Sequence, residues 1–262
     1  MDLPHAHAAF LDRALPVWRD DPRLQGVAAG GSLLHGGLDE YSDLDLVLVC
    51  SDAAREDVMA DRHDLAAAPG SLLQAFTGEH VGEPRLLICL YGPPLLHVDL
   101  KFVSLRELAE RIEDPQVLWE REGAVRARLA GTELTPEAAP DLQWIEDRFW
   151  TWMHYIEEKI ARGELLEALD GLGFVRGRVL GPLALHAVGR PPRGVRRLET
   201  ANRAWATEIT GTVARVDAAD CRRALAAAVE TYARLRDAHQ GGPALRRSPA
   251  EAPVRAHLRA RR

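Results

Sequence analysis

Apolar residues recur with two different periods along the first hundred residues. Residues 5–20 carry apolar side chains every three to four positions, which predicts a helix that ends at Asp21-Pro22. Shorter apolar runs with the length of strands follow at residues 25–30, 44–50, 86–91 and 95–103. Only Gly92-Pro93-Pro94 separates the last two runs, so we expect them to form an antiparallel hairpin.

A helical period dominates the rest of the chain. Helices are expected in the first half at residues 52–68, 105–113 and 116–129, and in the second half at residues 142–161, 165–180, 201–210 and 218–239. Small residues and prolines at 131–140 predict a linker. We therefore expect an α+β protein with a strand-containing domain at residues 1–135, an all-α domain at 141–240 and a flexible tail at 241–262.

The composition is that of an ordinary globular chain. Its 262 residues are 47% hydrophobic and 27% charged, and this length suits two domains. No apolar run approaches the roughly 18 residues of a membrane span, and the first residues do not resemble a signal peptide, so we expect a cytoplasmic protein. Cys50, Cys89 and Cys221 form no CxxC pair, which favours buried thiols over disulfides or a zinc site.

Charge is distributed unevenly along the chain. The net charge is −6, but six arginines against one glutamate give residues 241–262 a charge of +5, so residues 1–240 carry −11. An acidic body is poorly suited to the phosphate backbone of a nucleic acid, which favours a small-molecule partner. For the basic end we weigh a solvated tail against a nucleic-acid-binding arm, and its glycines and prolines favour the tail.

Two carboxylates stand at the start of the strand predicted at residues 44–50. Asp43 and Asp45 are two residues apart, so their side chains point to one face, about 6.6 Å apart along the strand. Val47 and Val49 continue that face, where unpaired anions would be costly. Because Mg²⁺ takes few, hard oxygen ligands and keeps positions for waters and substrate phosphates, the pair indicates a Mg²⁺ site.

A phosphate site is predicted next to these carboxylates. Gly31 and Ser32 end the preceding strand and open a helical turn, where backbone N–H groups and a hydroxyl can bind an anion. Ser42 offers a second hydroxyl near the same edge. A phosphate cradle beside a Mg²⁺ site is the arrangement that phosphoryl or nucleotidyl transfer requires.

The strand predicted at residues 95–103 supplies a third carboxylate. Strict alternation places His97, Asp99 and Lys101 on one face. If this strand lies beside the first, Asp99 completes a site for two metal ions and can take a proton from an attacking hydroxyl, while Lys101 offsets charge or contacts the substrate. The alternative is that His97 or Lys101 merely neutralises Asp99, but a polar face where a core is expected favours catalysis.

These motifs carry a family resemblance. Gly-Ser at 31–32, Ser-Asp-Leu-Asp-Leu at 42–46 and a later strand with a third Asp resemble the polymerase-beta-like nucleotidyltransferase superfamily, and within it the aminoglycoside and lincosamide nucleotidyltransferases. Over residues 26–103 the resemblance implies a mixed sheet flanked by helices, two Mg²⁺ ions, and ATP as donor of a nucleotidyl group to a hydroxyl with release of pyrophosphate. It also implies triphosphate contacts by Gly31, Ser32 and Ser42, and metal binding by Asp43, Asp45 and Asp99, the last as ligand or base.

A second, weaker resemblance lies in the predicted helical domain. Residues 149–169 are similar to the helical domain of streptomycin-type adenylyltransferases, which implies that Lys159, with Arg162 and Arg176 as helpers, contacts the triphosphate. Lys101 and Lys159 are the only lysines among 33 basic residues, which draws attention to Lys159. Tyr155 shares its helix face, and the alternative is that this aromatic stripe belongs to the core.

The resemblance implies a small-molecule acceptor, with an aminoglycoside-like antibiotic and hence antibiotic resistance as the leading hypothesis. A polycation needs carboxylates, which could come from Glu157, Glu158, Glu164, Glu167 and Asp170. By position alone, Glu79 and Glu83 are candidates for an additional base. Two alternatives stay open: AMP transfer to a protein, as in nucleotidyltransferase-type antitoxins, and a nucleotide-binding protein of this fold without turnover. The oligomeric state is also open.

Overall fold

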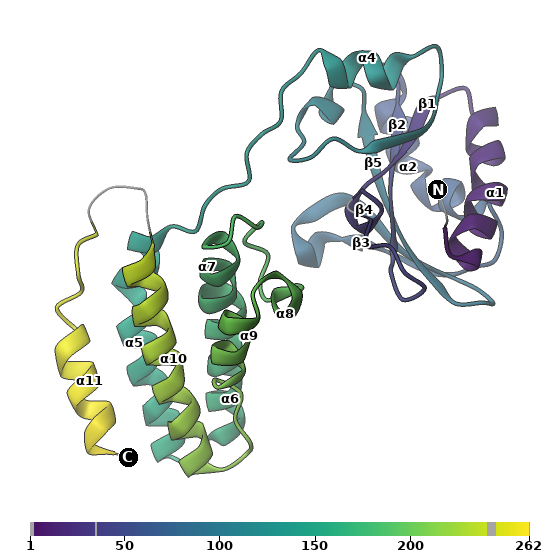
Figure 1. Ribbon diagram of the computed structural model, residues 1–262. Coiled ribbons are helices and arrows are strands. Elements are labelled where there is room, and N and C mark those ends of the chain that lie inside the picture. The colour runs from purple at the N-terminus through teal and green to yellow at the C-terminus, as the bar shows by residue number, and fades with distance from the viewer. Residues whose placement is uncertain (1–2, 35, 240–244, 262) are drawn as a thin grey trace. The chain divides into compact units, whose positions relative to one another are not determined.

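The structure is a computed structural model that describes residues 3–34, 36–239 and 245–261. The chain divides into two compact units, Met1–Pro136 and Glu137–Arg262 (Figure 1). The division falls inside the proline-rich segment that predicts a linker. Each unit has a hydrophobic core of its own, and each is described by itself.

The first unit is built around a mixed sheet. In the described residues its six strands follow the order β3-β4-β5-β2-β1-β6, with β2 and β5 parallel and the other neighbours antiparallel. The strands are β1 (Leu24–Ala29), β2 (Leu44–Cys50), β3 (Leu72–Gly78), β4 (Glu83–Tyr91), β5 (Leu96–Ser104) and β6 (Gln116–Glu120). The predicted antiparallel hairpin is confirmed as β4 and β5.

Helices pack on one face of this sheet to form the larger core of the unit. The helices and short 3-10 turns are α1 (His5–Asp20), η1 (Gly31–Leu33), η2 (Asp52–Ala54), α2 (Arg55–Ala60), α3 (Arg62–Ala67), η3 (Glu79–Val81), η4 (Glu107–Ala109) and α4 (Ala124–Ala130). Phe10 and Trp18 of α1 are buried against Leu46 and Leu100 of the sheet. The Trp18 indole Nε1 donates to the carbonyl of Leu65 at 2.9 Å, which ties α1 to α3.

The opposite face of the sheet carries both a small core and the acidic residues. Val49 of β2 and Val103 of β5 are buried there against Val125 of α4. Because side chains alternate along each strand, Asp45 and Asp99 lie on the same face as these valines, further toward the starts of β2 and β5. Both are half-buried, and their carboxylates lie at the end of this face that the valines do not cover.

Three stretches of the first unit differ from the elements that the sequence predicts. Residues 116–129 were expected to be one helix, but they form β6, which pairs with β1, a turn, and α4. The expected helix at 105–113 is only the turn η4, and the one at 52–68 is divided into η2, α2 and α3. Without β6, the outer edge of β1 would be unpaired. Pairing with β1 stabilises the strand at 116–120 more than the helical preference of its residues would stabilise a helix. β3 was not predicted.

The second unit is helical, as expected from its apolar spacing. Its helices are α5 (Leu142–Ala161), α6 (Leu165–Val175), the π-helical turn η5 (Arg176–Leu180), α7 (Gly181–His186), α8 (Leu198–Ala201), α9 (Arg203–Thr210), α10 (Ala218–Ala238) and α11 (Glu251–Ala260). Phe149 of α5 stacks on Tyr232 of α10 with ring centroids 3.8 Å apart, in the centre of the core. Asp141 caps α5 by accepting from the backbone N–H of Trp144 at 2.9 Å.

The basic end of the chain is not the free tail that we expected. It contains α11, which packs on α5 (Figure 1). Leu258 of α11 is buried. Glu251 of this helix accepts from the buried Arg236 at 2.8 Å. Val254 and Leu258 lie one turn apart on the apolar side of α11, and this short stripe is obscured in the sequence by the surrounding arginines. Residues 240–244 lie outside the described residues.

Two further expectations concern the chain as a whole. The thiols of Cys50, Cys89 and Cys221 are buried and unpaired, as predicted, and burial raises the pKa of Cys50 to about 11. Within the residues that the structure describes, no helix is both long and apolar enough to cross a membrane.

Candidate active site

The parallel pairing of β2 and β5 brings the predicted carboxylates together. Asp45 and Asp99 are register partners on these neighbouring strands, and Asp43 lies just before β2. One carboxylate oxygen from each of the three lies within 4.8 Å of the others. The sequence predicts this cluster only if the two strands are neighbours. The pairing of β2 with β5 shows that they are. A cluster of oxygen ligands at this spacing can hold Mg²⁺.

Asp45 lies so close to position 31 that only glycine fits there. Gly31 has a φ of 58°, and a Cβ atom built on it would lie only 1.8 Å from Oδ2 of Asp45. The backbone N–H of Gly30 donates to the carbonyl oxygen of Asp45 at 3.0 Å, which fixes β2 against the start of η1. Any side chain at position 31 would therefore displace a carboxylate of the cluster.

The hydroxyl of Ser32 is a candidate hydrogen-bond donor to a phosphate. Ser32 is 5% exposed, and its buried hydroxyl has no hydrogen-bond partner among the described residues. Such a group is costly to bury unless something accepts from it or donates to it. Because it lies in η1, one residue from the glycine that touches Asp45, a phosphate oxygen beside the carboxylates fits this position.

The hydroxyl of Ser42 is engaged within its own loop, and its contact with the triphosphate stays a prediction. This hydroxyl donates to Oδ1 of Asp39 at 2.9 Å and accepts from the backbone N–H of Asp39 at 3.0 Å. The carbonyl of Ser42 lies 2.7 Å from Nε2 of the buried His7. These contacts hold the loop that leads into Asp43. His7 could not be recognised from the sequence, because its partner is 35 residues away and its helix has the pattern of a simple core helix.

The face around Asp99 is a network of ion pairs. Nε2 of His97 lies 3.0 Å from Oδ1 of Asp99, so the contact that we weighed as an alternative exists beside the cluster. Lys101 instead pairs with Glu83 at 2.7 Å. A hydrogen bond from Arg85, assisted by Lys101 and opposed by partial burial, lowers the pKa of Glu83 to about 2. Such a carboxylate is unsuited to the role of additional base, and Glu79 is engaged by the hydroxyl of Thr77.

Lys159 and Arg162 belong to the second unit, where glutamates neutralise them. The ammonium of Lys159 lies 2.7 Å from Glu164 and 3.2 Å from Glu167, and 5.0 Å from the ring centroid of Tyr155. The hydrogen bonds that the ammonium donates to these glutamates raise the pKa of Lys159 above its ordinary value. Arg162 lies 3.8 Å from Glu164. Their triphosphate contacts stay a prediction, which requires the nucleotide to replace these carboxylates.

Comparisons with known proteins give matches only among solved structures: no protein-family model matches the chain, and no curated protein is significantly similar to it. The chain is similar to an aminoglycoside 6-adenyltransferase from Bacillus subtilis, with 18% identity and a TM-score of 0.44 over 97% of this chain and 96% of that one. It is also similar to a nucleotidyltransferase-like protein from Exiguobacterium sibiricum 255-15, with 13% identity, a TM-score of 0.38, and coverage of 98% and 79%. Conclusions about chemistry rest on the site itself.

The glutamates that could serve a polycationic acceptor are already paired within the second unit. Glu157 is buried and bonded to Arg222 at 2.9 Å, and Glu158 lies 3.1 Å from His257. Glu164 and Glu167 share Lys159, as described above. A cationic acceptor binding to these carboxylates would therefore compete with basic groups of the chain.

Proposed function

We propose that this protein is a Mg²⁺-dependent nucleotidyltransferase that moves AMP from ATP to a hydroxyl group of a small molecule. The observation that supports it most is the convergence of Asp43, Asp45 and Asp99 within 4.8 Å, from two parallel strands and the loop before one of them. Beside that cluster lie Gly31 and the buried hydroxyl of Ser32, for which the described part of the chain offers no hydrogen-bond partner. Such a reaction requires at least carboxylates that bind metal ions and, beside them, groups that donate hydrogen bonds to phosphate.

The three carboxylates are the residues that would hold Mg²⁺, with two ions in the proposed complex. Their all-oxygen donor set suits a hard cation and not a thiophilic metal. When bound, the ions neutralise the charge of the triphosphate and of the departing pyrophosphate.

The chain itself binds and orients the reactants. Ser32 donates from its hydroxyl to a phosphate oxygen, and Gly31 keeps the space next to Asp45 free of a side chain. Asp99 accepts the proton of the acceptor hydroxyl, with His97 orienting its carboxylate. The acceptor oxygen then bonds to the α-phosphorus, the bond from that phosphorus to the bridging oxygen breaks, and pyrophosphate leaves.

The test is a pyrophosphate-release assay with ATP, GTP, CTP and UTP, each with and without Mg²⁺, against a panel of aminoglycosides and other polyhydroxylated acceptors. Turnover with ATP that requires Mg²⁺ is expected. Asp45→Asn should reduce it at least about a hundredfold, because a metal ligand is lost, while thermal stability is unchanged or raised as repulsion between the carboxylates is relieved. Asp12→Asn, on an exposed position of α1, is the matched control.

Other outcomes separate the alternatives. Label transferred from ATP to a protein band, with no product among small acceptors, would favour AMP transfer to a protein. Nucleotide binding without pyrophosphate release for any acceptor would favour a nucleotide-binding protein. Full activity in Asp45→Asn with reduced stability would contradict the catalytic assignment. For the acceptor, aminoglycosides are the first class to assay, and raised resistance of a sensitive host on expression is the expected result.

A further inference from the structure

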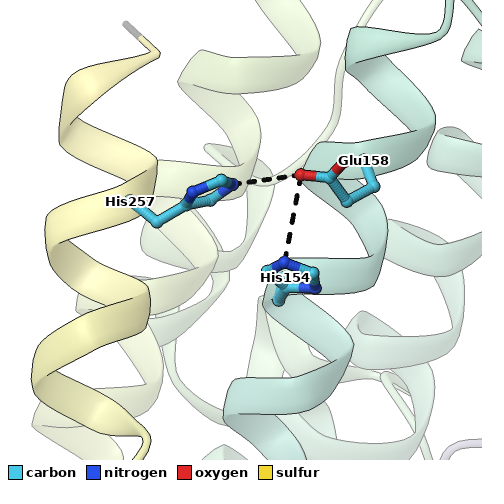
Figure 2. A group of neighbouring side chains, drawn as sticks. All are labelled: His154, Glu158 and His257. Carbon is cyan, nitrogen blue, oxygen red and sulfur yellow. Dashed lines mark hydrogen bonds and ion pairs between the residues drawn. The ribbon is translucent and has the colours of Figure 1, made fainter.

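A second group of metal-ligating side chains lies in the second unit, between α5 and α11. His154 and Glu158 are one helical turn apart on α5, and His257 faces them from α11 (Figure 2). One ligand atom from each of the three lies within 4.8 Å of the others. This group contains two histidines and belongs to the second unit, whereas the group in the first unit consists of carboxylates alone. The proposed function does not use it.

We propose that His154, Glu158 and His257 bind a divalent transition metal of the Zn²⁺ class, which fastens α11 to α5. Two imidazole nitrogens and one carboxylate oxygen are the donor set that Zn²⁺ and its neighbours select, whereas Mg²⁺ and Ca²⁺ prefer oxygen alone. Three protein ligands leave a fourth position for water.

Two of the three distances between ligand atoms are close to those of a tetrahedral site. With bonds of about 2.0 Å from zinc, ligand atoms lie roughly 3.3 Å apart. Nε2 of His257 is 3.1 Å from Oε1 of Glu158, and Nε2 of His154 is 3.9 Å from the same oxygen. A small rotation of the half-exposed His154 side chain closes the remaining difference.

The chemical state of the ligands also fits. The carboxylate of Glu158 supplies an anionic oxygen beside the two imidazoles, and this charge favours a divalent cation. Arg261 approaches the carboxylate of Glu158 at 3.7 Å, and its side chain is 40% exposed, so it can withdraw into solvent when a cation enters. Nε2 of each imidazole must be deprotonated to bind a metal, so the contact between His257 and Glu158 gives way to bonds from both side chains to the ion.

The consequence for the fold would be a cross-link at the end of the chain. A ten-residue helix such as α11 is marginal by itself and depends on its packing. In the structure it is held by Leu258 and by ion pairs from Glu251 and Arg255. A ligand that binds only when α5 and α11 are together stabilises that arrangement.

The test is calorimetric titration of Zn²⁺ into the full chain in excess Mg²⁺, which occupies oxygen-only sites. One Zn²⁺ site is expected in the wild type and in Asp45→Asn. His154→Gln, Glu158→Gln and His257→Gln should each weaken binding at least about tenfold, since each removes a ligand. The control is His239→Gln, because His239 stacks on His186 with ring centroids 5.5 Å apart and could otherwise account for the binding.

A second measurement separates metal binding from a structural role of these side chains. Zn²⁺ should slow amide hydrogen exchange in residues 251–260 of the wild type and leave it unchanged in Glu158→Gln. His154 is about half exposed, so its substitution should not prevent folding. Equal Zn²⁺ affinity in the wild type and His257→Gln would overturn the proposal. So would loss of Zn²⁺ binding in either of the single variants His239→Gln and Asp45→Asn.

Discussion

Gly31 makes the clearest prediction at the scale of single residues. Gly31→Ala should abolish most turnover and cost about 1–3 kcal/mol of folding stability, because the new methyl group meets Asp45 and the φ of 58° disfavours a side chain. Gly70→Ala is the matched control: it has a φ of 80°, but its Cβ meets no described atom within 4 Å. Steady-state kinetics and chemical denaturation measure both effects, and equal activity losses in the two variants would contradict the steric argument.

The two serines should respond differently to the same substitution. Ser32→Ala removes a buried hydroxyl without a described partner, so stability should hold or rise while ATP affinity falls by roughly fivefold, about 1 kcal/mol. Ser42→Ala removes the hydrogen bonds to Asp39, so it should cost about 1 kcal/mol of stability and affect ATP affinity less. Thermal denaturation and nucleotide titration of both variants check this, and a stability loss confined to Ser32→Ala would refute it.

At the scale of elements, the ion pairs between β4 and β5 predict a pH dependence. The lowered pKa of Glu83, about 2, means that its contribution to stability is complete above its unfolded pKa of 4.5 and is lost as pH falls toward 2. Glu83→Gln should therefore destabilise the protein by about 1–2 kcal/mol at neutral pH, after allowance for partial exposure, and much less near pH 2. Denaturation at several pH values tests this. Glu56→Gln, an exposed change on α2, should show no such pH-dependent difference.

The elements also show what the sequence can predict and where it fails. α1, β2 and α5 have the bounds that we predicted, because each has one unambiguous period and a clear end. β6 was missed because Gln116–Glu120 is a strand only by virtue of pairing with β1, a contact that local pattern does not contain. In the site, alternation predicted which residues share a face within each strand, but the meeting of Asp45 with Asp99 depends on the pairing of β2 with β5, which local pattern does not contain. The Ser42 contact with Asp39 depends on loop geometry and was not foreseeable.

At the scale of the whole molecule, two separate cores predict two unfolding transitions. If Mg²⁺ and ATP bind through the first unit alone, calorimetry should show only that unit's transition moving to higher temperature. If Lys159 also contacts the triphosphate, both transitions should move, and Lys159→Ala should cancel the shift of the second. Asp45→Asn should cancel the shift of the first, and a shift that survives in it would contradict nucleotide binding at the carboxylates.

The parallel pairing of β2 with β5 also has a consequence for how the protein reaches its native state. Asp45 and Asp99 are far apart in the chain, and the β4–β5 hairpin can form from neighbouring residues well before β2 joins it. The carboxylates repel one another at the moment when this long-range pairing closes. The capacity to bind Mg²⁺ should therefore appear late in refolding, and Mg²⁺ in the refolding buffer should favour the final closure of the sheet.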